Sequence, residues 1–170
     1  MKYLVEMTQV NEEELPEIYC DMDMVLVNFV GRAEELIGDK FTNVDKETRW
    51  EAIKGKKDFW HTLDWMPGAE RMWKLINKYD ANILSAYSTR DPNSRPGKKV
   101  WLKKNAKPKG DVLLVQRADK KKYAITDGKP NILIDDYIKN IKEWESAGGI
   151  GIHHTSPSNT ISQLKKYGFR

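Results

Sequence analysis

EIYCDMDMVLVNFV, residues 17–30, is the stretch that decides the fold, because two aspartates interrupt an otherwise apolar segment. A near-continuous apolar run is typical of a strand buried on both faces of a parallel sheet, and we predict such a strand over 17–27. Asp21 and Asp23 stand where this strand would reach the surface. Burying carboxylates is costly unless a metal ion or hydrogen bonds hold them. Two neighbouring carboxylates also repel, which raises the pKa of one of them and lets it keep a proton.

The composition is that of a single globular domain. The chain has 170 residues, of which 39% are hydrophobic and 32% charged, and this is enough to bury one core. No run approaches the roughly 18 apolar residues of a membrane-spanning helix, and the N-terminus lacks the apolar core of a signal peptide. Cys20 is the lone cysteine, so a reducing cytoplasm fits. We therefore predict one cytoplasmic domain over residues 1–170, with no membrane partner.

The net charge of +4 is unevenly distributed along the chain. The segment 95–122 carries a net charge of +9, whereas the remainder is net negative. A basic segment of this kind indicates an anionic partner such as phosphate or nucleic acid. Lysines in such a segment also commonly form no more than a solvated helix face. Both interpretations stay open at this point.

Predicted strands alternate with predicted helices from residue 17 onward. After the first strand, we predict strands at 82–86, 111–116, 131–136 and 149–154, and helices at 69–79, 98–106, 137–149 and 160–168. A short strand is predicted at Tyr3–Met7, and helices fall within 29–57 with Asp45 or Asn43 as an N-cap. The alternation predicts a parallel α/β sheet with right-handed crossovers.

The polar groups of interest follow the carboxyl ends of predicted strands. They are Asp21, Asp23, Ser85, Asp135 and Asp136. Ligands of parallel sheets bind at that edge, so these side chains should converge there. Ligands that are all oxygen favour a hard cation, Mg²⁺ above all, which usually also contacts a substrate phosphate. With a hydroxyl and nearby lysines to hold phosphate oxygens, the constellation predicts phosphoryl transfer.

Four motifs, taken in order, resemble those of a known family. DMDMVLVNF, ILSA, ADKKKYA and NILIDD are similar to the motifs of the haloacid dehalogenase superfamily, and most similar to its 5'(3')-deoxyribonucleotidase branch. The resemblance covers about residues 18–164. It implies a Rossmann-like three-layer parallel sheet, with a small helical cap inserted after the first strand over 30–66. It also implies a Mg²⁺-dependent phosphatase with an aspartyl-phosphate intermediate.

The resemblance also implies catalytic roles. Asp21 would attack phosphorus as the nucleophile, and Asp23 would protonate the leaving oxygen and then activate water. Ser85 would hydrogen-bond the transferring phosphoryl group, with Ala86 beside it in contact with the substrate. Lys120 would balance the developing charge, and the alternatives for this lysine are Lys98 and Lys122. The Mg²⁺ ligands would be Asp21, Asp135, Asp136 and the main-chain carbonyl of Asp23.

Aromatic residues of the inserted segment match base-stacking positions of the deoxyribonucleotidases. Phe29 follows Asp21 at the family's spacing, and Phe59 and Trp60 match a second aromatic pair. Base stacking is worth roughly 1–3 kcal/mol per base, so these rings would suit a mononucleotide. Met24 stands where the family nearly always has glycine, and it adds strain if the position needs the backbone that glycine adopts. Asn28 replaces a usual aspartate.

Three functions follow from these observations. The first is a Mg²⁺-dependent phosphatase of nucleoside monophosphates that prefers deoxy forms. The second is a phosphatase of polynucleotide ends, which would use the basic segment 95–122 and lose activity as salt rises. The third is a nucleotide-binding protein that has lost catalysis, with Met24 as the damaged position.

Overall fold

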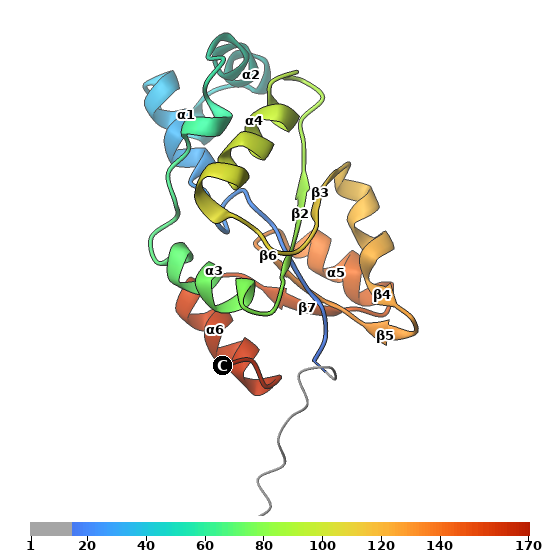
Figure 1. Cartoon of the computed structure of the whole chain (residues 1–170). Helices are drawn as coiled ribbons and strands as arrows, with labels where there is room; N and C mark the ends of the chain where they lie inside the picture. Colours follow the sequence, from blue (N-terminus) through green and yellow to red (C-terminus); the bar gives the residue numbers. More distant parts are fainter. Residues whose placement is uncertain (1–14) are drawn as a thin grey trace, which may run out of the picture.

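The chain forms one five-stranded parallel sheet with helices on both sides (Figure 1). This computed structural model describes residues 15–170, so the strand predicted at Tyr3–Met7 lies outside the described residues. The strand order is β3-β2-β1-β6-β7, and every neighbouring pair is parallel. The strands are β1 (Ile18–Cys20), β2 (Asn82–Ala86), β3 (Val112–Val115), β6 (Ile132–Asp135) and β7 (Ile150–His153). This is a Rossmann-like α/β fold, as the alternating pattern predicts.

Helices cover both faces of this sheet. Figure 1 shows α3 (Ala69–Asn77), α4 (Ser94–Trp101) and α6 (Pro157–Lys166) on one side, and α5 (Ile138–Ser146) on the other. Two shorter helical elements belong to this part of the chain. The π-helical turn η4 (Leu102–Ala106) continues α4, and the 3₁₀ helix η5 (Arg117–Tyr123) packs on α5. A small hairpin of β4 (Ile125–Thr126) and β5 (Lys129–Pro130) follows η5. Within residues 15–170, no helix has the length and apolar character needed to cross a membrane.

The segment between β1 and α3 is helical. It contains α1 (Phe29–Ile37), the 3₁₀ helix η2 (Phe41–Asn43), α2 (Lys46–Gly55) and the 3₁₀ helix η3 (Trp60–Thr62). Asn28 caps α1 by accepting a hydrogen bond from the Gly31 N–H, and Asp45 caps α2 through the Thr48 N–H. In Figure 1, α1 and α2 lie together at one end of the molecule.

The first strand is shorter than the sequence predicts. β1 ends at Cys20, and the chain then folds back on itself, because the N–H groups of Leu26 and Val27 both donate to the Met22 carbonyl at 2.8 and 3.0 Å. Val25, Leu26 and Val27 are nevertheless buried. The inserted segment covers them, and the Met66 N–H donates to the Leu26 carbonyl at 2.7 Å. Burial of this run therefore comes from a covered loop and not from a longer strand.

Met24 has the left-handed backbone conformation that glycine adopts easily. Its φ is 62°, and its N–H donates to the Val27 carbonyl at 2.8 Å inside the tight loop. An L-residue in this conformation costs about 1–2 kcal/mol. The Met24 thioether accepts a hydrogen bond from the Val30 N–H, 3.4 Å away in the first turn of α1. The strain that the sequence predicts at this position is confirmed.

Candidate active site

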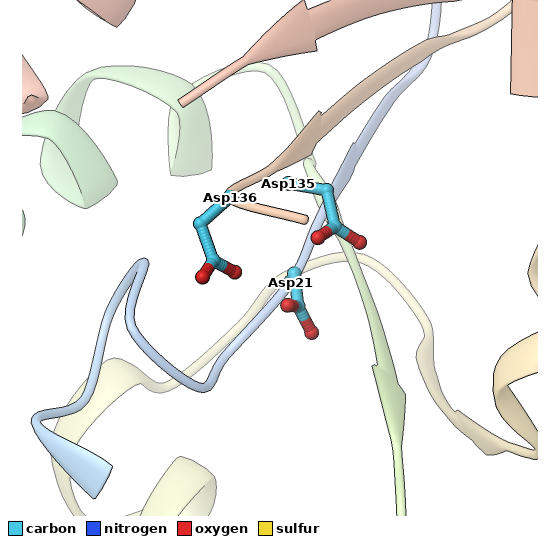
Figure 2. A group of neighbouring side chains, drawn as sticks. All are labelled: Asp21, Asp135 and Asp136. Atoms are coloured by element: carbon cyan, nitrogen blue, oxygen red, sulfur yellow. The ribbon is translucent and has the colours of Figure 1, made fainter. Parts of the chain in front are cut away.

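An acidic cluster lies where β1 and β6 end side by side. Asp21 follows β1, and Asp135 and Asp136 come from the end of β6 (Figure 2). One carboxylate oxygen from each of these three residues lies within 4.8 Å of the other two. Asp21 and Asp135 are buried, and Asp136 is the most exposed of the three. The structure therefore brings together three of the four predicted metal-site aspartates through their side chains.

Lys120 neutralises part of this cluster. Its Nζ lies 3.0 Å from Asp21 Oδ1 and 2.8 Å from Asp135 Oδ2, and the side chain is only 4% exposed. Burial by itself lowers the pKa of Lys120, but the two carboxylates outweigh it and raise the pKa above the ordinary value. The 3₁₀ helix η5 directs Lys120 inward, whereas Lys122 is exposed and pairs with Asp119. Of the two, only Lys120 reaches the acidic cluster.

A second buried lysine, Lys98, contacts Asp23, the other aspartate of the DMD motif. Lys98 on α4 is fully buried, and its Nζ contacts Asp23 Oδ2 at 2.9 Å, Ser85 Oγ at 3.1 Å and the Ala86 carbonyl at 2.7 Å. The site thus has two lysines, each paired with one aspartate of the DMD motif. Ser85 and Ala86 end β2, so their contact with Lys98 places that strand end in the same site.

The carboxylates differ in their affinity for protons. Burial raises the pKa of Asp23, and the Lys98 ammonium reverses part of this shift. Burial and the charge of Asp21 raise the pKa of Asp135, and they raise that of Asp136 to about 7. Four acidic side chains face two lysines, so the site has an excess of negative charge when all four are ionised. A cation is the simplest group to balance it.

Asn140 is a residue of the site that the sequence analysis missed. Its Nδ2 donates to Asp135 Oδ2 at 3.0 Å, and its Oδ1 accepts a hydrogen bond from Arg117 at 2.9 Å. The Tyr137 N–H donates to the other Asp135 oxygen at 2.9 Å. These contacts fix the orientation of the Asp135 carboxylate. The position of Asn140, one turn after the aspartate pair on α5, is the only sequence signal that pointed to it.

The predicted base-stacking residues lie in one aromatic cluster. Phe29 stacks on Trp60 with ring centroids 5.4 Å apart, and Trp50 stacks on Trp60 at 6.3 Å. Phe59 meets Phe29 and Trp60 edge to face. Phe59 and Trp60 are buried, so neither offers a free ring face in this structure, whereas Phe29 and Trp50 are partly exposed.

A buried hydrogen bond attaches this aromatic cluster to the loop after β2. Trp60 Nε1 donates to Asp91 Oδ2 at 2.7 Å, and Asp91 is only 1% exposed. The Trp60 ring also lies under Lys98, with Nζ 5.3 Å from the ring centroid. The inserted segment and the helix that carries Lys98 are therefore held together close to Asp23 and Ser85.

Replacing Asp91 by alanine is expected to lower the free energy of unfolding by about 1–3 kcal/mol, because the buried Trp60 N–H then has no acceptor. Chemical denaturation monitored by tryptophan fluorescence measures this. Asp64→Ala is the matched control, since Asp64 is an exposed aspartate of the same inserted segment, and its unfolding curve should overlay the wild type. Equal stabilities for Asp91→Ala and Asp64→Ala would show that the Trp60 bond contributes nothing.

Of the comparisons with known proteins, only the one with solved structures gives matches. No protein-family model matches the chain, and no curated protein sequence matches it. A hydrolase from Streptococcus pneumoniae superposes with a TM-score of 0.61 at 11% identity, covering 89% of this chain and 99% of that one. A haloacid dehalogenase-like family hydrolase from Streptococcus pneumoniae gives 0.54 at 11% identity, covering 88% and 98%. At this identity the likeness shows a shared fold, over nearly the whole of each chain.

Proposed function

We propose that this protein is a Mg²⁺-dependent phosphomonoesterase that hydrolyses nucleoside monophosphates, with deoxynucleotides preferred. The observation that carries the proposal is the pairing of two aspartates with two buried lysines at the carboxyl edge of the sheet. Asp21 and Asp23 occupy different surroundings, as nucleophilic and acid–base roles require. The fold shared with haloacid dehalogenase-like hydrolases adds support.

In the first step, a carboxylate oxygen of Asp21 forms a bond to the substrate phosphorus, and the bond from phosphorus to the ester oxygen breaks. The departing oxygen takes a proton from Asp23. Burial raises the pKa of Asp23, which is the direction of shift that a general acid needs. Its Oδ1 accepts no hydrogen bond among the described residues, whereas its Oδ2 is held by Lys98.

In the second step, water attacks the phosphorus of the aspartyl phosphate. Asp23, now ionised, takes the proton of that water, and the bond from phosphorus to Asp21 breaks, which regenerates both carboxyl groups. Splitting hydrolysis in this way replaces one difficult displacement by two easier ones. Lys98, which contacts Ser85, and Lys120, which contacts Asp21, would stabilise the charge of the transferring phosphoryl group.

The residues present fit a bound Mg²⁺. The cluster of Asp21, Asp135 and Asp136 supplies only oxygen donors, which suit this hard cation, and its negative charge exceeds what Lys120 neutralises. The main-chain carbonyl of Asp23 is the further proposed ligand. When bound, Mg²⁺ would screen the repulsion between the phosphate and Asp21.

A nucleotide substrate is supported by the aromatic cluster beside the site. Phe29 and Trp50 are partly exposed and rest on the buried Trp60, whose ring in turn lies under Lys98. A base in contact with these two rings would lie near the lysine that holds the phosphoryl group. Stacking on aromatic side chains tolerates different bases, so we expect a modest preference among them.

Phosphate release from a panel of deoxynucleotides, ribonucleotides and sugar phosphates tests this proposal. We expect turnover of nucleoside monophosphates in Mg²⁺, none in excess EDTA, and a kcat/KM about 5- to 150-fold lower for sugar phosphates, because one stacked base contributes roughly 1–3 kcal/mol. Equal kcat/KM values for sugar phosphates and nucleotides would contradict the proposed nucleotide substrate.

Thermal unfolding tests the metal half without relying on activity. Mg²⁺ at millimolar concentration should raise the Tm of the wild type, because it binds the folded acidic cluster and not the unfolded chain. Asp136→Asn removes one proposed ligand and should shrink this Mg²⁺-dependent rise. A Tm that does not respond to Mg²⁺ in the wild type would contradict the metal site.

A further inference from the structure

Some cations of the basic segment 95–122 contact acidic side chains, and the others are exposed. Lys98 and Lys120 point inward to the catalytic aspartates, and Arg117 and Lys122 form ion pairs with Glu143 and Asp119. Of the other seven cations, Lys121 is exposed on η5, and six lie on α4, on η4 and in the turn that follows. These six are Arg95, Lys99, Lys103, Lys104, Lys107 and Lys109, and all six are exposed. Among residues 15–170, none of the six forms an ion pair.

Three of these lysines line one groove. Lys99, Lys103 and Lys107 surround a groove of about 410 Å³, and we call it the lysine groove. Its apolar lining is formed by Leu102, Pro108 and Val112. No aspartate or glutamate occurs between Asp91 and Asp111 in the sequence, so no acidic neighbour along this segment offsets the three ammonium groups.

The lysine groove lies along the same continuous helix, α4 followed by η4, that carries Lys98. Lys98, one residue before Lys99 on α4, is the buried lysine that holds Asp23. Arg95 precedes Lys99 by one turn, and its guanidinium lies over the ring of Tyr87, the residue that follows β2. From Arg95 to Lys107 the helical rise amounts to about 18 Å. Arg95, Lys99, Lys103 and Lys107 follow one another at four-residue spacing, so a line of positive charge runs along this helix, from the turn that holds Lys98 to the amino end of β3 at Val112.

We propose that the lysine groove binds the sugar–phosphate chain of a single-stranded nucleic acid whose terminal phosphate enters the site at Asp21. This rests on the proposed function, because it extends the substrate of that site from a mononucleotide to the end of a strand. Each nucleotide beyond the terminal one adds a phosphodiester that pairs with a lysine, while the apolar lining contacts sugars and bases. A mononucleotide has no phosphodiester and makes no use of the groove.

Equilibrium binding of a terminally phosphorylated oligodeoxynucleotide of about ten residues tests the proposal. The probe carries a dye at the opposite end, the phosphate is placed at the 5' end or the 3' end, and all proteins carry Asp21→Asn to prevent turnover. Three phosphate contacts give a slope of log Kd against log salt of about 2, so affinity should fall about 20-fold between 50 and 200 mM salt. We expect this fall in affinity with the phosphate at the 5' end, at the 3' end, or at both.

Two triple variants locate the binding surface. Lys99→Gln, Lys103→Gln and Lys107→Gln together should weaken binding at least about 20-fold in 50 mM salt and remove most of the salt dependence. The control is Arg71→Gln, Lys74→Gln and Lys165→Gln, which removes the same charge from a second basic groove between α3 and α6. The control should bind as the parent does. Equal weakening by both triple variants would overturn the proposal, since only net charge would then matter.

Kinetics in an otherwise wild-type chain separate this proposal from the proposed function. The lysine-groove variant should keep the kcat/KM for mononucleotides and raise the KM for phosphorylated oligonucleotides at least about tenfold. If the protein turns over mononucleotides but its binding of oligonucleotides does not depend on the lysine groove, the proposed role of the groove is wrong and the proposed function stands. Groove-dependent binding without any phosphate release would overturn the proposed function and leave the binding surface supported. Tighter binding of a polyglutamate peptide than of the oligonucleotide would overturn the nucleic-acid assignment.

Discussion

Replacing Asp21 by asparagine should reduce phosphate release by at least about 10³-fold, because the amide oxygen cannot form the aspartyl phosphate. The amide keeps nearly the same shape and still offers an oxygen to Lys120, 3.0 Å from Asp21 Oδ1 in the wild type. Loss of one negative charge also relieves repulsion with Asp135 and Asp136. The variant should therefore fold at least as stably as the wild type in the absence of Mg²⁺.

Steady-state phosphate release and thermal unfolding, measured on the same preparation, check this result. A rapid acid quench should trap phosphate on wild-type protein and none on Asp21→Asn. The matched control is Asp127→Asn, an exposed aspartate in the β4–β5 turn, and it should keep full activity. If wild type and Asp21→Asn are equally inert in Mg²⁺, the chain binds nucleotides without catalysis, and Met24 becomes the first position to revert to glycine.

The sheet was largely predictable because its strands are short apolar runs bounded by polar residues. The strand at 82–86 has the predicted bounds, and the other three predicted after the first lie within the predicted ranges. The first strand was predicted too long, because an apolar run does not distinguish a strand from a covered loop. Helix α4 begins at Ser94, before the predicted start at Lys98, and that extra turn positions Arg95 near Tyr87.

The family resemblance favoured Lys120, with Lys98 and Lys122 as alternatives, and Lys120 is the lysine that contacts Asp21 and Asp135, but the local residue pattern alone did not decide among them. Three consecutive lysines follow Asp119, and a one-residue change of register in a 3₁₀ helix decides which of them is buried. The residues around Lys98 do not indicate its contact with Asp23 either, because the two residues are 75 positions apart in the sequence. The same holds for Asp91, whose partner Trp60 belongs to the inserted segment. Contacts of this kind depend on how elements pack, and periodicity carries no information about them.

Lys120→Met should be the most destabilising of the substitutions considered. The ammonium forms ion pairs with Asp21 and Asp135, and all three side chains are less than a tenth exposed. Removing the cation leaves two carboxylates uncompensated in a buried site, which costs about 3–5 kcal/mol. Phosphate release should also fall at least about 100-fold, because a charge that stabilises the transferring phosphoryl group is lost. Methionine fills a similar volume, so a cavity contributes little.

Lys122→Met is the matched control, because Lys122 lies two residues away in the same 3₁₀ helix and forms an exposed ion pair with Asp119. Such pairs contribute little, so its denaturation curve and activity should match the wild type. Mg²⁺ should restore part of the stability of Lys120→Met, and raise its Tm more than that of the wild type, since a bound cation neutralises the same carboxylates. If Lys120→Met unfolds as Lys122→Met does, the acidic cluster does not need this cation. Lys98, which already contacts Asp23 and Ser85, would then be the lysine that stabilises the phosphoryl group.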